Sequence, residues 1–148
     1  RRNTKAILIA YETVQRADVA AIRLRADSDP LRRQIGADAI TIDALPFQIG
    51  RQIKGDKTAT LSKTGLSLRT LDVHHLSPEH FAIDVQDGVL VVRDLGSDLG
   101  TLVNGRRISH FEPDSAVPLG LGFNEVMAGG ADSPFKFAIE LEPKKKSR

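Results

Sequence analysis

The sequence predicts an all-β domain, an antiparallel β-sandwich of about eleven strands that follows a short N-terminal extension. After residue 25, helical spacing of apolar residues is scarce, and short alternating runs of apolar and polar residues dominate. Two of the breaks between these runs are Asp87-Gly88 and Asn104-Gly105, dipeptides that supply the positive φ of a tight hairpin. Residues 135–141 alternate cleanly, as expected for a strand with one buried face. Two sheets that each bury one apolar face would accommodate this number of short strands.

The expected strands follow one another along most of the chain. The segment Asp27–Pro30 ends the first of them, because Pro pre-sets a turn and is excluded from central strands. Residues 5–16 fit either an added strand or a helix outside the sandwich, and residues 52–70 form a long polar connection whose end is a strand. The predicted strands are residues 19–25, 39–42, 47–50, 66–68, 81–85, 89–92, 101–103, 106–108, 117–119, 123–127 and 135–141.

The chain divides into an N-terminal extension or linker at residues 1–18, a sandwich at 19–142 and a basic tail at 143–148. Its net charge is +2, from 21 basic and 19 acidic residues. Six of the basic residues lie at the two ends, so the body carries a charge near −4. A domain that binds nucleic acid across its face is expected to keep a basic body, because phosphate neutralisation supplies most of that affinity. We therefore expect solvated tails and no nucleic-acid partner; contacts through the terminal Arg and Lys residues are the alternative.

Composition excludes several other classes of protein. The chain has no Cys, which rules out disulfides, thiolate zinc sites and a cysteine nucleophile. Its longest apolar run, residues 6–10, is far too short to cross a bilayer and lacks the cleavage site of a signal peptide. Because the chain opens with Arg, we expect a piece of a longer protein, water-soluble and cytoplasmic, with no membrane partner.

Three clusters lie at junctions between strands and loops. Gly50-Arg51 ends a strand, Ser77-Pro78-Glu79-His80 precedes one, and the run from Asp94 to Gly105 surrounds another. Together, in this order, they resemble the signature of the forkhead-associated (FHA) domain: Gly-Arg, then Ser-x-x-His, then Asp-x-x-Ser-x-Asn-Gly-Thr-x-x-Asn-Gly. The resemblance covers about residues 19–142. It implies an eleven-stranded sandwich, of the fold shared with SMAD domains, whose loops at one end capture a phosphothreonine of a partner protein in signalling.

The resemblance assigns roles to individual residues. Arg51 would fork two hydrogen bonds onto the phosphate, a geometry that Lys cannot match. Ser77 would donate its hydroxyl proton, with its backbone N–H as a second donor, and His80 would hold the Ser77 loop without touching the ligand. Each residue also has a plainer explanation, since Arg51 could be a solvated arginine and Ser77 a turn-former before Pro78. The structural members of the motif are Gly50, His80, Gly100, Thr101, Asn104 and Gly105. Asn104-Gly105 is most simply a hairpin turn, and Gly100 permits the backbone conformation of a tight loop.

The sequence departs from the family pattern inside the expected pocket. Leu99 replaces the Asn that, by resemblance, bonds the main chain of the bound peptide. Asp98 replaces a small polar residue that helps to hold the phosphate, and its carboxylate would repel a dianion. Pro78 replaces a residue, commonly Arg, that often adds a contact. Lysines of the 52–70 connection (Lys54, Lys57 and Lys63) would compensate if that connection folds over the site. The alternative function is an FHA-fold scaffold that binds its partner independently of phosphorylation.

Other signals point away from catalysis. Residues 50–58 look like a phosphate loop, but Asp56 intrudes between Gly55 and Lys57 and no βαβ pattern surrounds them. His74-His75 with His80 would be a metal site only with further ligands, which the pattern does not supply. No serine elbow or paired carboxylates are visible. We therefore expect no enzyme, no metal and no cofactor.

Overall fold

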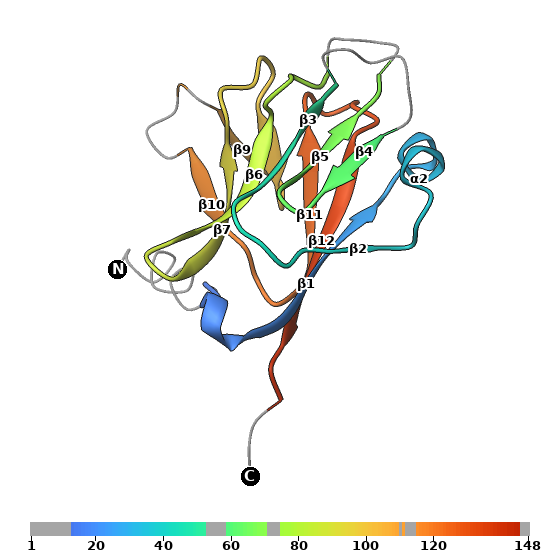
Figure 1. The fold of residues 1–148 in the computed structure, drawn as a ribbon. Coiled ribbons are helices and arrows are strands. Elements are labelled where there is room, and N and C mark those ends of the chain that lie inside the picture. The colour runs from blue at the N-terminus through green and yellow to red at the C-terminus, as the bar shows by residue number, and fades with distance from the viewer. Residues whose placement is uncertain (1–12, 53–58, 71–74, 110, 112–114, 146–148) are drawn as a thin grey trace.

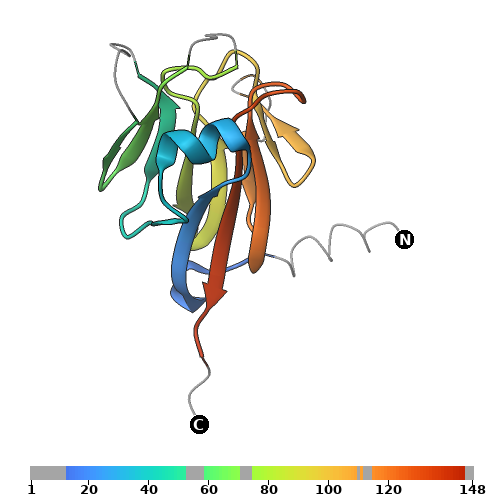
Figure 2. The same cartoon turned by 90° about the vertical axis from the view of Figure 1, so that its right-hand side faces the viewer.

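Two six-stranded sheets pack face to face in the computed structural model (Figures 1 and 2). The structure describes residues 13–52, 59–70, 75–109, 111 and 115–145. The first sheet has the order β2-β1-β12-β11-β8-β9, and the second has the order β10-β7-β6-β3-β5-β4. The strands are β1 (Val19–Ala26), β2 (Ile40–Thr41), β3 (Phe47–Arg51), β4 (Thr60–Ser62), β5 (Gly65–Leu68), β6 (Phe81–Gln86), β7 (Val89–Asp94), β8 (Thr101–Val103), β9 (Arg106–Ile108), β10 (Ala116–Pro118), β11 (Gly122–Ala128) and β12 (Lys136–Pro143).

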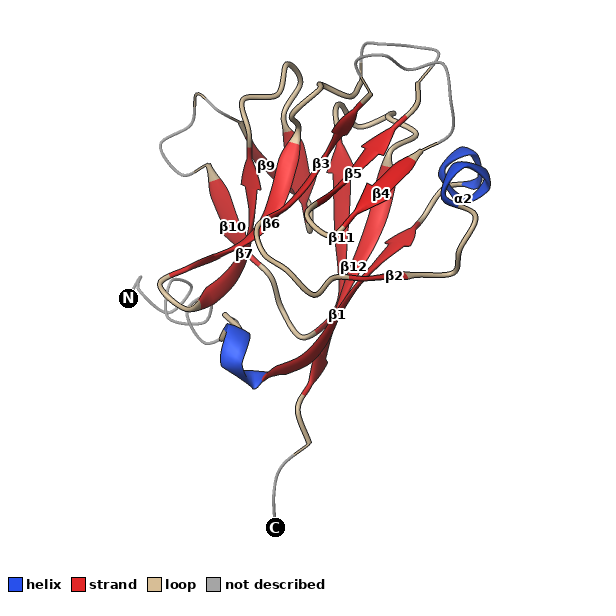
Figure 3. Ribbon diagram, viewed as in Figure 1, coloured by secondary structure: helices blue, strands red, loops and turns tan. Residues whose placement is uncertain are grey.

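The predicted all-β sandwich is confirmed, and all eleven predicted strands are present with bounds that shift by one or two residues. Strands dominate the ribbon coloured by secondary structure (Figure 3). Both predicted tight turns have the required backbone. Asp87 and Gly88 have φ of 53° and 82° between β6 and β7, and Asn104 and Gly105 have φ of 51° and 83° between β8 and β9. Two consecutive residues at positive φ match the twist of the flanking strands.

The core lies between the two sheets. The alternating face of the last strand is buried as predicted, since Phe135, Phe137, Ile139 and Leu141 are all at most 5% exposed. Phe81 of β6 meets Phe137 of β12 edge to face, with ring centroids 5.6 Å apart. Such contacts between inward-facing side chains hold the sheets together and give the loops at their ends a rigid base.

The structure corrects three details of the prediction. The 52–70 connection contains a hairpin of β4 and β5, and β5 runs parallel to β3, so the sandwich is not purely antiparallel. The break at Asp27–Pro30 opens a helix, α2 (Asp29–Ile35), because a Pro that excludes a strand is well tolerated in the first turn of a helix. The helix ends at Gly36 in the left-handed conformation.

The described part of the N-terminal extension packs against the sandwich. A short 3-10 helix, η1 (Arg16–Asp18), precedes β1, and Gln15 forms an isolated bridge with Val89. Val14 is buried in the core at 6% exposure, and its carbonyl accepts a hydrogen bond from the Leu90 amide. The choice between strand and helix for residues 5–16 falls mostly outside the described residues. No helix in the described part of the chain is long and apolar enough to cross a membrane.

Candidate functional site

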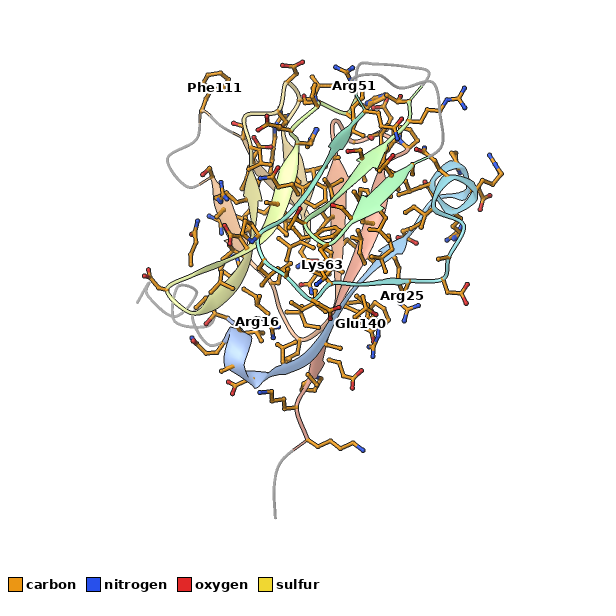
Figure 4. All side chains as sticks on the ribbon, viewed as in Figure 1. Arg16, Arg25, Arg51, Lys63, Phe111 and Glu140 are labelled. Carbon is orange, nitrogen blue, oxygen red and sulfur yellow. The ribbon has the colours of Figure 1, made fainter. Side chains whose placement is uncertain are left out.

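The end of β3, the segment of residues 75–80 before β6 and the loop after β7 meet at one end of the sandwich, at the top of Figure 1. Arg51 is the last residue of β3 and lies at this end (Figure 4). Its amide donates to the Ser77 carbonyl (2.9 Å), and its Nε donates to the Leu76 carbonyl (2.9 Å). These bonds hold the half-buried side chain by its inner nitrogen. The terminal nitrogens, Nη1 and Nη2, bond to no described residue.

Gly50 lets the loop before β6 approach β3. A Cβ at this position would overlap the Pro78 carbonyl oxygen and lie 2.6 Å from its carbonyl carbon and 3.1 Å from the Ser77 carbonyl oxygen. Only Gly gives these backbones the room to meet. Close approach at Gly50 is therefore what brings Ser77 next to Arg51.

Ser77 is held on both sides. Its amide donates to Nδ1 of His80 (3.0 Å), so the backbone N–H that we expected to face a ligand is already used. Its hydroxyl oxygen accepts a hydrogen bond from the Asp98 amide (3.0 Å). The hydroxyl proton is left to donate, because a serine hydroxyl both donates and accepts.

His80 is fully buried beneath this loop. Its Nδ1 accepts from the Ser77 amide, so the ring proton sits on Nε2, which donates to the Gly100 carbonyl (2.7 Å). Burial lowers the pKa of His80 below its usual range, while the Gly100 carbonyl and the charges of Asp94 and Asp98 oppose that shift. A neutral imidazole thus ties the Ser77 loop to the loop that ends at Gly100.

The loop after β7 is organised by the buried carboxylate of Asp94. One oxygen accepts from the hydroxyls of Ser97 (2.6 Å) and Thr101 (2.9 Å), and the other accepts from the amides of Gly96 and Ser97 (both 3.0 Å). The Ser97 hydroxyl oxygen in turn accepts from the Gly100 amide (2.9 Å). The sequence motif by itself assigns Asp94 and Ser97 no separate role. Their spacing is the signal for it, since an Asp side chain commonly bonds the amides two and three residues on.

Asp98 and Leu99 form the tip of this loop. Asp98 is exposed, and Leu99 is exposed by 37%. Asp98 and Arg51 share no ion pair, and among the described acidic side chains none pairs with Arg51. The structure thus places Asp98 next to Ser77 through its amide, without an ion pair between its carboxylate and the Arg51 guanidinium.

The remaining motif residues lie in two places. Gly100 (φ 83°) directly precedes β8, and the fully buried Thr101 is the first residue of this strand, beneath the site. Asn104 lies at the far end of β8, where its side chain accepts from the Glu125 amide (2.8 Å) and donates to Asn124 (2.9 Å). Asn104-Gly105 is therefore a hairpin turn remote from the site, in accord with the plainer explanation of this dipeptide.

Two further expectations concern the lysines of the 52–70 connection as phosphate contacts and the histidines as metal ligands. Lys63 lies in the turn between β4 and β5, level with Gln48 and far below Arg51 (Figure 4), so it does not reach the site. Lys54, Lys57 and His74 lie outside the described residues. Among described residues, no group of three metal-ligating side chains comes together, and both ring nitrogens of His80 are engaged.

Comparison with known proteins places this geometry in a family. A search of curated proteins finds no match. The fold resembles the solved FHA domain of an Arabidopsis thaliana hypothetical protein (20% identity, TM-score 0.55, 91% of this chain and 94% of that chain). It also resembles the FHA domain of CT664 from Chlamydia trachomatis (19%, TM-score 0.53, 85% and 100%) and EmbR of Mycobacterium tuberculosis in complex with a low-affinity phosphopeptide (20%, TM-score 0.52, 96% and 30%).

These structural likenesses bear on the fold alone, and the sequence match decides the family. The family model of the FHA domain matches residues 47–120, which is half of the chain. The matched range holds Gly50-Arg51, Ser77, His80 and the Asp94 loop. The chain therefore belongs to the FHA domain family.

Proposed function

We propose that this domain binds a phosphothreonine-containing segment of a partner protein, with Arg51 and Ser77 as the two phosphate contacts and Asp98 and Leu99 at the rim of the site. The observation that carries the proposal is the state of Arg51. Its inner nitrogen is fixed on the Leu76 carbonyl, whereas its two terminal nitrogens bond to no described residue. A guanidinium held in this way offers a fork of donors with little further loss of side-chain freedom.

The chemistry of a phosphothreonine suits this arrangement. Its phosphate carries a charge of about −1.5 to −2 and has three strong acceptor oxygens. Arg51 supplies a charge and two parallel donors, and the Ser77 hydroxyl supplies a third. EmbR, which shares the fold at 20% identity, has been solved with a phosphopeptide, which supports the same ligand class here.

The position of Asp98 also favours this function over the scaffold alternative. An ion pair with Asp98 would have filled the phosphate position with a carboxylate of the domain itself. No such pair forms among the described residues. As far as the described residues go, the guanidinium is therefore available to an external dianion.

Isothermal titration with a phosphothreonine peptide library tests the proposal. Arg51→Ala should weaken the best peptide by about 2–5 kcal/mol, because a desolvated phosphate loses its charged partner. Arg51→Lys should recover only part of this loss, since an ammonium does not fork. Arg106→Ala, which removes an exposed Arg beside the remote Asn104-Gly105 turn, is the matched control and should bind as the wild type does.

Phosphatase treatment separates the two functions. Loss of partner binding after treatment supports the phosphothreonine site. A partner that binds equally well before and after treatment, and equally well to Arg51→Ala, would instead establish the phosphorylation-independent scaffold.

A further inference from the structure

We propose, on the basis of the function above, that the site selects phosphothreonine segments that carry a Lys or Arg within a few residues of the phosphothreonine. The cationic head would pair with the Asp98 carboxylate, and its methylene stem would lie on Leu99. Asp98 is thus a specificity-determining residue of the site.

The backbone fixes where the Asp98 carboxylate can be. The Asp98 amide donates to the hydroxyl oxygen of Ser77, the proposed phosphate contact, at 3.0 Å. A carboxyl group one methylene away from its Cα stays within about 5 Å of its own amide. Asp98 therefore presents a negative charge within about 8 Å of the Ser77 hydroxyl in any rotamer.

That charge forms no ion pair in the described part of the chain. Asp98 is exposed and takes part in none of the ion pairs among the described residues. A second carboxylate, Glu79, is also exposed on the loop that carries Ser77. The guanidinium of Arg107 lies against Gly100, on the same loop, but forms no ion pair with Asp98. A phosphate bound by Arg51 would therefore lie near like charge, and a cation on the ligand itself offsets that repulsion.

Leu99 specifies which kind of cation fits. It is the neighbour of Asp98 at the loop tip and is 37% exposed, so an apolar surface adjoins the carboxylate. Lys and Arg have an apolar stem and a charged head, and they cover apolar surface while the head reaches a charge. The pair Asp98-Leu99 matches this amphipathic side chain better than it matches an acidic or small polar one.

Fluorescence anisotropy with matched peptides tests the inference. The parent peptide carries phosphothreonine with Ala at the flanking positions, and a single Lys or Glu is moved from three residues before to three residues after it. Wild-type protein should bind one Lys peptide about tenfold more tightly than the parent, a difference of about 1.4 kcal/mol. In Asp98→Asn that gain should fall below about twofold, and Asp98→Lys should favour Glu at the same position.

Two further variants complete the design. Leu99→Ser should reduce the gain from Lys without reversing its sign. Asp87→Asn removes an exposed carboxylate at the opposite end of the sandwich and should retain the full gain. A thermal melt of each variant confirms that the fold is kept.

The outcomes distinguish this inference from the function on which it rests. If binding requires phosphate and Arg51, yet the gain from Lys is equal in wild type and Asp98→Asn or absent from both, the inference is wrong and the proposed function stands. If phosphorylated and unphosphorylated peptides bind alike and Arg51→Ala changes nothing, the proposed function is wrong and the inference goes with it.

Discussion

Replacing Gly50 by Ala would force β3 and the Ser77 loop apart. The new Cβ would overlap the Pro78 carbonyl oxygen and lie 2.6 Å from its carbonyl carbon, whereas carbon atoms in contact are about 3.5–4.0 Å apart. The neighbour is backbone, so no side-chain rotation relieves the overlap, and the loop must retreat by about 1 Å or more. A hydrogen bond of 2.9 Å does not survive such a shift.

This displacement would break three hydrogen bonds. They run from the Arg51 amide to the Ser77 carbonyl, from Arg51 Nε to the Leu76 carbonyl, and from the Asp98 amide to the Ser77 hydroxyl oxygen. At about 1 kcal/mol each they total about 3 kcal/mol, and the stiffer unfolded chain of the Ala variant returns about 0.5 kcal/mol. The free energy of unfolding should therefore fall by about 2–3 kcal/mol.

Guanidinium chloride unfolding measures this change, and titration with a phosphothreonine peptide measures the accompanying loss of affinity. Gly120→Ala is the matched control, because the nearest atom to its new Cβ is 3.8 Å away and its φ is not positive. Its stability should stay within about 0.5 kcal/mol of the wild type. A Gly50→Ala variant as stable as that control, with wild-type affinity, would refute the argument that close backbone approach assembles the site.

Two further predictions concern the buried polar groups beneath the site. Asp94→Asn should lower the free energy of unfolding by about 2 kcal/mol, because an amide cannot accept all four hydrogen bonds that the carboxylate accepts. Chemical unfolding measures the loss, with Asp87→Asn as the exposed control. Equal stability of the two variants would contradict the prediction. The lowered pKa of His80 means that the unfolded chain binds its proton at a higher pH than the folded domain does. Stability should therefore be complete above about pH 6.5 and fall as the pH drops below it, by at most about 1.4 kcal/mol per pH unit. Phosphopeptide affinity should fall only at a still lower pH, where His80 of the folded domain is itself protonated and its Nδ1 no longer accepts from the Ser77 amide. Unfolding curves from pH 7 to pH 5 check the stability prediction, and a flat profile for the wild type would count against it.

Much of the fold was predictable from local sequence. The alternation in residues 135–141 correctly placed one buried face, and Asp87-Gly88 and Asn104-Gly105 correctly located two hairpins. The failures have a common cause. The helix α2 and the hairpin of β4 and β5 lie in polar stretches, where periodicity is weak and the decisive contacts come from elsewhere in the chain.

The candidate site was predictable in outline only. Motif spacing singled out Arg51, Ser77 and Asp98, but not that the Ser77 amide is consumed by His80 or that Lys63 lies at the wrong end of β5. The direction of β5 relative to β3 determines at which end of the sandwich Lys63 lies. The parallel pairing of β3 and β5 is a long-range choice that no local pattern encodes.

The order of apolar and polar residues, with its turn dipeptides, determined by itself that this chain forms short strands in a sandwich, since strand period and turn geometry are properties of neighbouring residues. Tertiary structure alone decided that the Arg51 guanidinium keeps its outer nitrogens clear of Asp98. That outcome depends on two loops from different strands meeting through the Asp98 amide and the Ser77 hydroxyl. The physical reason is that a hydrogen bond across 21 positions of the chain exists only once the two sheets have packed and carried both loops to the same end.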